Sequence, residues 1–305
     1  MGFQPCYIKT YKSGKLREKI EAAYKIIESC TLCPNLCRVN RLEGKLGDCK
    51  AGKDPMISSA SPHFGEEAPL VGRHGSGTIF LTGCNLHCLY CQNYEISHSM
   101  MGEVVSVEEF ANQMLYLQSL GCHNINFVTP SHQVPQILAA LEVAIPKGLK
   151  IPLVYNTGGY DSIQELKLME NIIDIYMPDF KYWDKEVAKK YSIEAKDYPE
   201  IARAAFKEMH RQVGDLVINE KGIAQRGMLI RHLVLPEGLA GTKGVMHFIA
   251  TELSKNSYVN IMDQYRPCGQ AWDFPPLDRR ISHEEYRKAI DIAKKEGLHR
   301  GFPRI

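Results

Sequence analysis

A nine-residue segment, residues 83–91, constrains this chain more than any other part of its sequence. It places Cys84, Cys88 and Cys91 at the spacing C-x3-C-x2-C, directly after an apolar run over residues 78–82. Three cysteine thiolates can bind three irons of a [4Fe–4S] cluster, which normally takes four cysteines. The fourth iron then lacks a protein ligand, and an open coordination position distinguishes a reactive metal site from a structural one. We therefore expect this loop to offer one iron to a small chelating ligand.

This cysteine spacing, with Tyr90 just before the last cysteine, resembles the signature of the radical S-adenosylmethionine (SAM) superfamily. The resemblance implies that SAM binds the open iron through its amino and carboxylate groups. It also implies that one electron from the cluster breaks a carbon–sulfur bond, and that the resulting 5′-deoxyadenosyl radical abstracts hydrogen from a substrate. The protein would supply position, electrostatics and exclusion of water. A disulfide scaffold or a zinc knuckle is the alternative, and nothing marks the chain for the oxidising compartment that disulfides require.

The composition excludes several other classes of protein. The net charge is only +2 over 305 residues, so no broad basic field would recruit nucleic acid or a membrane surface. No apolar stretch approaches the roughly 18 residues that a membrane-spanning helix needs. The first residues lack the apolar core of a signal peptide. We expect a cytoplasmic protein, because a reducing compartment suits ten cysteines and an oxygen-sensitive cluster.

Six short apolar stretches alternate with amphipathic helical patterns from residue 78 onward. They are expected as strands at residues 78–82, 125–128, 151–155, 172–177, 228–234 and 258–262. Near-continuous apolar strands separated by helices favour a parallel sheet covered by helices. Six such units predict the α/β class, with a partial (β/α)6 TIM-like barrel of the kind that radical SAM enzymes typically have. We expect a Cys-rich N-terminal extension over residues 1–72, the barrel over 73–268, and a C-terminal segment packed on it over 269–305.

Ligands of such sheets bind at the carboxyl ends of the strands, where this chain carries polar residues and glycines. Two of these ends resemble the glycyl-radical-enzyme activases, the family of pyruvate formate-lyase activating enzyme. Asp179-Phe180-Lys181 matches their Asp-Leu-Lys motif, which lies near the SAM ribose and methionine. Arg231 matches their fifth-strand arginine, whose planar fork suits the methionine carboxylate. The alternatives are a surface ion pair for Asp179 and Lys181, worth about 0–1 kcal/mol, and a salt bridge inside the barrel for Arg231.

Other strand ends complete the expected SAM pocket, with two departures from the activase pattern. Tyr90 is expected beside the adenine, and Thr129, Ser131 and Asn156 in the loops that complete the pocket. Residues 129–132 read Thr-Pro-Ser-His where the activases carry Gly-Gly-Glu-Pro, so the usual carboxylate is missing. Tyr265 falls near the position of their sixth-strand histidine. Both changes fit the uncharacterised paralogues of the activases and place the glycyl-radical substrate in doubt.

A second group of four cysteines precedes the barrel. We call it the N-terminal cysteine set; its members are Cys30, Cys33, Cys37 and Cys49. Four cysteines complete a tetrahedral zinc or iron site or a second cuboidal cluster. The spacing matches neither the paired C-x2-C motifs of a zinc ribbon nor the ferredoxin run, and a structural metal is slightly favoured. Buried reduced thiols are the alternative.

The sequence as a whole predicts a radical SAM enzyme that cleaves SAM reductively and abstracts hydrogen from a substrate. A protein glycine is the leading substrate by resemblance to the activases, and a small molecule modified at an unactivated carbon is the second choice. An external one-electron donor of the ferredoxin or flavodoxin type is the expected partner. A non-catalytic iron–sulfur electron carrier is the alternative from another class, although such a protein has no need of the polar residues expected around SAM.

Overall fold

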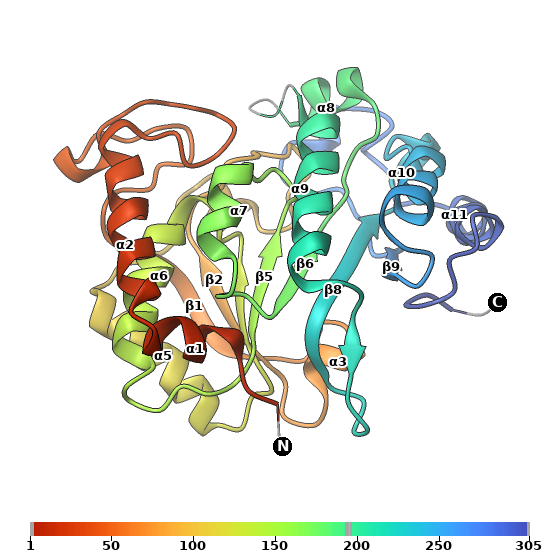
Figure 1. Cartoon of the computed structure of the whole chain (residues 1–305). Coiled ribbons are helices and arrows are strands. Elements are labelled where there is room, and N and C mark those ends of the chain that lie inside the picture. The colour runs from red at the N-terminus through yellow and green to blue at the C-terminus, as the bar shows by residue number, and fades with distance from the viewer. Residues whose placement is uncertain (1–2, 193–194, 196, 304–305) are drawn as a thin grey trace.

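The computed structural model describes residues 3–192, 195 and 197–303, and it consists of one mixed sheet with helices packed around it (Figure 1). The strands are β1 (Met56–His63), β2 (Ser76–Leu81), β3 (Glu103–Val104), β4 (Ile125–Val128), β5 (Leu153–Thr157), β6 (Ile175–Pro178), β7 (Val217–Ile218), β8 (Ala224–Leu233) and β9 (Tyr258–Met262). The α-helices are α1 (Cys6–Lys12), α2 (Lys15–Ile26), α3 (Ala68–Val71), α4 (Tyr94–Ser97), α5 (Val107–Ser119), α6 (Val134–Ala144), α7 (Ile163–Met169), α8 (Lys185–Tyr191), α9 (Tyr198–Val213), α10 (Thr242–Phe248) and α11 (His283–Lys295).

Six parallel strands form the body of the sheet, in the order β2-β4-β5-β6-β8-β9. They are the six strands that the apolar stretches predict, shifted by up to four residues at their starts. Strand β1 pairs antiparallel with β2 and extends the sheet at one edge, while β9 pairs with β8 at the other. The sheet is therefore an unclosed, barrel-like arc, which confirms the predicted partial barrel.

Local sequence signals explain where the principal helices begin. Ser106 and Ser282 each accept a hydrogen bond from the backbone N–H three residues on, and Glu109 and Glu285 bond back to the capping serine's N–H. These capping boxes satisfy two otherwise unpaired donors at the starts of α5 and α11. Within the described residues, no helix has both the length and the apolar character needed to cross a membrane.

The core lies between the sheet and its helices, and it fixes the positions of the strand ends. The strands β4, β5 and β6 are buried at every residue. Full burial of both faces is the expected consequence of helices covering a parallel sheet. In Figure 1, α7 and α9 lie in front of β5 and β6, the N-terminal helices lie at one side, and α10 and α11 lie at the other.

Sequence reasoning missed the antiparallel strand β1. No strand was expected at residues 56–63, which form β1. Residues two apart in a strand share a face, but Ile57 is buried and Ser59 is exposed. The two-residue burial period that marks a strand is therefore weak in β1. The antiparallel pairing places the end of β1 beside the start of β2, with His63 opposite Ser76, and the following loop brings Glu66 to within 3.4 Å of Arg231.

Candidate active site

The three cysteines of residues 83–91 lie in the loop that leads from β2 to α4, beside a cavity of about 390 Å³. Each sulfur accepts a hydrogen bond from the protein. The backbone N–H of Leu86 donates to Cys84 at 3.3 Å, the Ser192 hydroxyl to Cys88 at 3.1 Å, and the Ser97 hydroxyl to Cys91 at 3.3 Å. Such bonds orient sulfur ligands and tune the potential of a bound iron–sulfur cluster.

The same cavity is lined by residues from the carboxyl ends of all six parallel strands or from the loops that follow them. Besides the three cysteines, its polar lining includes His63, Glu66, Asn85, Gln92, Asn93, Ser97, Thr129, Asn156, Thr157, Asp179, Lys181, Arg231 and Gln264. Its volume falls in the range of small-molecule sites, about 300–1,000 Å³. The parallel topology thus brings distant parts of the chain to one site.

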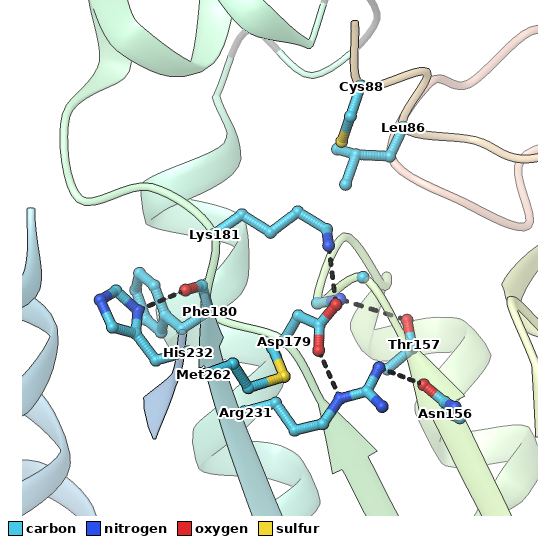
Figure 2. Close-up of polar contacts among 12 residues, drawn as sticks. Leu86, Cys88, Asn156, Thr157, Asp179, Phe180, Lys181, Arg231, His232 and Met262 are labelled. Carbon is cyan, nitrogen blue, oxygen red and sulfur yellow. Dashed lines mark hydrogen bonds and ion pairs between the residues drawn. The ribbon is translucent and has the colours of Figure 1, made fainter. Parts of the chain in front are cut away.

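Asp179 lies between two cations at the end of β6 (Figure 2). Its carboxylate accepts a hydrogen bond from Lys181 Nζ at 2.7 Å and another from Arg231 Nε at 2.7 Å. The exposed fractions of these side chains are only 13–17%, so this is not the surface ion pair that was the alternative for Asp179 and Lys181. Burial alone would raise the Asp179 pKa, but the Arg231 and Lys181 charges outweigh it and lower that pKa to about 2.

Arg231 connects three neighbouring acceptors. Besides Asp179, its Nη2 donates to Asn156 Oδ1 at 2.9 Å and its Nη1 lies 3.4 Å from Glu66 Oε2. These contacts use three of the five N–H groups of a guanidinium, which leaves two to donate to a ligand in the cavity. Burial raises the pKa of Glu66, and the Arg231 charge opposes that shift.

Comparison with known proteins agrees with this arrangement. Residues 78–219 match the family model described as the radical SAM superfamily. An uncharacterised protein of Methanocaldococcus jannaschii is 32% identical over 295 residues, which is 94% of this chain and 80% of that relative. The chain belongs to the radical SAM superfamily. Membership implies a [4Fe–4S] cluster, SAM and radical chemistry, while the resemblance to the glycyl-radical-enzyme activases stays a prediction.

Two solved structures are similar to the chain at low sequence identity. Methylornithine synthase has a TM-score of 0.47 and 12% identity, over 95% of this chain and 72% of that one. TYW1 with a lysine–pyruvate adduct bound has a TM-score of 0.45 and 10% identity, over 72% of this chain and 73% of that one.

The donor set in the cavity fits the cofactors of the radical SAM superfamily. Three sulfurs face one side of a cavity that could accept a SAM-sized molecule, and charged groups of both signs line another part of it. SAM itself carries a carboxylate, an ammonium and a sulfonium group, so both signs have a partner.

Most residues expected to contact SAM line this cavity, but Ser131 does not. Tyr90, Thr129 and Asn156 lie in its wall, together with Asp179, Lys181 and Arg231. The Ser131 hydroxyl is buried and donates to Asp161 Oδ1 at 2.5 Å. Thr157 donates to the same carboxylate, whose pKa is raised by burial. Ser131 therefore supports the loop after β5 from behind.

Tyr198, at the start of α9, is a positioning residue that sequence reasoning missed. Its hydroxyl oxygen accepts a hydrogen bond from the Lys181 backbone N–H at 2.8 Å. The hydroxyl lies 2.9 Å from the Gly158 carbonyl oxygen and 2.8 Å from that of Asp179. It thus joins the loops after β5 and β6. No local sequence signal indicates this, because a tyrosine inside an amphipathic helix is usually a core residue.

His132 and Tyr265 both lie deeper than their sequence positions suggest. His132 follows the carboxyl end of β4, but it is 1% exposed, and its Nε2 lies 2.8 Å from the Thr82 carbonyl oxygen. Burial lowers the pKa of His132 to about 4. The Tyr265 hydroxyl donates to the Leu277 carbonyl at 2.6 Å, and its ring packs edge-on against Tyr90. Tyr265 therefore backs the cavity wall.

The N-terminal cysteine set lines a second, much smaller cavity, together with Arg41 and His132. This region packs directly on the loop of residues 83–91. Asn35 Nδ2 donates to the Asn85 carbonyl at 3.0 Å, and His87 Nε2 lies 3.0 Å from the Asp48 carbonyl. Among the described residues, no three His, Cys, Asp or Glu side chains are arranged as the ligands of a single metal ion.

Proposed function

We propose that Cys84, Cys88 and Cys91 bind three irons of a [4Fe–4S] cluster and that the adjoining cavity holds SAM. When bound, the cluster and SAM supply a one-electron cleavage that yields a 5′-deoxyadenosyl radical able to abstract hydrogen. The observation that carries this proposal is that the cysteine triplet and the Asp179–Lys181–Arg231 ion pairs line one cavity. An electron carrier would have no use for such buried charges beside its cluster.

The residues of this chain bind and orient SAM and keep water away from it. Arg231, already held by Asp179 and Asn156, directs its remaining N–H groups at the methionine carboxylate. Lys181 and Asp179 would lie near the ribose and methionine, and Thr129 lines the same pocket. Tyr90 is buried at 4% exposure and would pack beside the adenine. Because these side chains are already fixed by hydrogen bonds, little ordering is left for SAM binding to impose.

The substrate and the donor are proposed from resemblance alone. The motifs at Asp179 and Arg231 support a protein glycine as the hydrogen source, and a small molecule is the second choice. A ferredoxin or flavodoxin would provide the electron in a reducing cytoplasm. Residues 1–72, 73–268 and 269–305 are proposed as extension, catalytic core and C-terminal segment. Deuterium transfer from labelled candidate substrates into 5′-deoxyadenosine would identify the substrate.

The test of the proposed chemistry is release of 5′-deoxyadenosine. Anaerobically reconstituted protein with a strong reductant and SAM should release it, and Cys88→Ala should reduce the release to background. Cys122→Ala is the matched control, because Cys122 is buried but belongs to neither cysteine group. Equal release from the Cys88→Ala variant and the wild type would refute the proposal.

A further inference from the structure

The sulfurs of the N-terminal cysteine set line one cavity, but they are not arranged to bind a single metal ion. Within the described residues, no three His, Cys, Asp or Glu side chains are placed as the ligands of one ion. A zinc ion holds each of its sulfurs at about 2.3 Å, which brings four of them close together. A core of four irons and four sulfides keeps its thiolates farther apart, and four cysteines are its usual ligands.

A buried, unbalanced cation faces this space. Arg41 is 1% exposed and lines the cavity. Its Nε and Nη2 both donate to the Gly52 carbonyl, at 3.1 and 2.7 Å, whereas its Nη1 has no hydrogen-bond partner in the described part of the chain. An arginine stays charged in a protein, and burying a charge is costly without an opposite charge nearby. An iron–sulfur cluster with four thiolate ligands is an anion in both redox states, so it would provide that charge.

His132 closes the cavity on the side of the active-site loop. Its Nε2 lies next to the Thr82 carbonyl oxygen, so this nitrogen carries the ring proton. The other ring nitrogen, Nδ1, then has a free lone pair. Within the described residues, Nδ1 is buried and has no hydrogen-bond partner. The ring lines the cysteine cavity, and a Cβ placed on Gly83 would come within 3.2 Å of it. His132 is thus a wall shared by the two cysteine regions.

We propose that the N-terminal cysteine set holds a second [4Fe–4S] cluster, with Arg41 as its buried counter-charge. Cluster assembly displaces the thiol protons, including the one that Cys37 shares with Asp48 at 3.2 Å. The ligands and the charge both come from residues 30–49, so this part of the proposal stands whether or not the active-site assignment is correct.

The contacts between the two regions give the second cluster a role, which rests on the proposed function. A Cβ on Gly83 would lie only 2.4 Å from the Cys49 carbonyl oxygen, so the two backbones are in direct contact next to Cys84. The second cluster would accept one electron from a ferredoxin- or flavodoxin-type donor and pass the same electron to the active-site cluster, and it would thereby return to its oxidised state. In this role it would be an electron relay.

Removing the active-site cluster isolates the second one. The triple variant Cys84→Ala, Cys88→Ala, Cys91→Ala should retain about four irons and four sulfides per chain after anaerobic reconstitution, half of the wild-type content. It should also show the electron paramagnetic resonance (EPR) signal of a reduced [4Fe–4S] cluster. A triple variant without iron, or one that holds a stoichiometric zinc ion, would overturn the proposal. Neither result depends on whether SAM is cleaved.

The role of Arg41 has its own test in the same triple variant. Arg41→Gln removes the positive charge, so the midpoint potential of the retained cluster should become more negative, or the iron content should fall. Arg38→Gln is the matched control, because Arg38 is an exposed arginine next to Cys37. An unchanged potential and iron content in Arg41→Gln would show that Arg41 does not balance the cluster.

The relay predicts magnetic coupling between the two clusters. The EPR spectrum of fully reduced wild-type protein should be broadened relative to the sum of two isolated clusters, and the broadening should be absent in the triple variant. Sharp, additive spectra would place the clusters too far apart to interact and would overturn the relay while leaving the second cluster intact.

Discussion

The two cysteine regions of this protein differ in both ligand number and free space. The active-site loop brings three cysteines to a cavity of about 390 Å³ that is lined by charged side chains. The N-terminal cysteine set brings four cysteines to about 10 Å³ beside one buried arginine. A centre with three ligands and open space can bind and transform a molecule, whereas a fully ligated, enclosed centre can exchange only electrons or hold the chain together.

Among the changes considered, loss of the Asp179 carboxylate should destabilise the active-site region most. Asp179→Asn leaves Lys181 buried without its counter-charge and Arg231 with only the longer contact to Glu66, so the free energy of unfolding should fall by about 3–5 kcal/mol. The wild-type pKa of about 2 lies below that of an unfolded aspartate, so this contribution is present above about pH 4 and is lost as the pH falls towards 2. Denaturant unfolding of both proteins at pH 7 and pH 3 would check this, since their difference should shrink at pH 3.

In the same variant the N-terminal region should be unaffected. Its iron content, measured in a background that lacks the active-site cysteines, should equal that of the unsubstituted background. Loss of that iron would show that the two regions do not behave independently and would weaken the contrast between them.

A substitution at the contact between the regions should affect both. Gly83 has a φ of +88°, and a Cβ there would meet the Cys49 carbonyl oxygen at 2.4 Å. Gly83→Ala should therefore lower the free energy of unfolding by about 2 kcal/mol through backbone strain alone, and the clash should reduce iron binding in both regions. Gly222→Ala is the control, because Gly222 has a φ of +79° with open space around it. Equal iron content in the two variants would argue against a tight contact.

A conservative change at Arg231 should have the smallest effect. Arg231→Lys keeps the charge, but its three N–H groups share one nitrogen and cannot reproduce the spread of the guanidinium, which contacts Asp179 and Asn156 with N–H groups to spare for a ligand. The loss of a charged hydrogen bond is worth about 1.5–3 kcal/mol, so SAM should bind at least about tenfold more weakly. Calorimetric titration of SAM would measure this. Unchanged affinity would show that Arg231 supports the cavity wall without contacting SAM.

Local sequence signals predicted the six parallel strands, the cysteine triplet and six of the other residues that line the cavity. The six apolar stretches are strands because full burial on a parallel sheet requires continuous apolar residues. The motif residues Asp179 and Arg231 lie together because β6 and β8 are neighbours in the sheet.

Long-range pairing accounts for what the sequence did not predict. Glu66 reaches Arg231 only because β1 turns back along β2, and Tyr198 joins two loops from a helix that follows them in the chain. His132 is buried because residues of the N-terminal extension cover it. Each of these contacts joins segments that are distant in the chain and meet only in the folded protein. A short stretch of sequence therefore cannot predict them.

The length of helix α2 determines where along the barrel the N-terminal cysteine set lies. The preceding helix α1 is anchored to the barrel by Tyr7, whose hydroxyl donates to the Ile151 carbonyl. Within α2, Lys19 Nζ donates to the carbonyls of Lys167 and Leu168. Twelve residues of helix span about 18 Å, so α2 acts as a spacer between those anchors and Cys30. Inserting a single residue would lengthen it by about 1.5 Å and rotate all that follows by about 100°. The length of α2 thus constrains how this chain can be engineered, because it sets the position of the N-terminal cysteine set relative to the barrel.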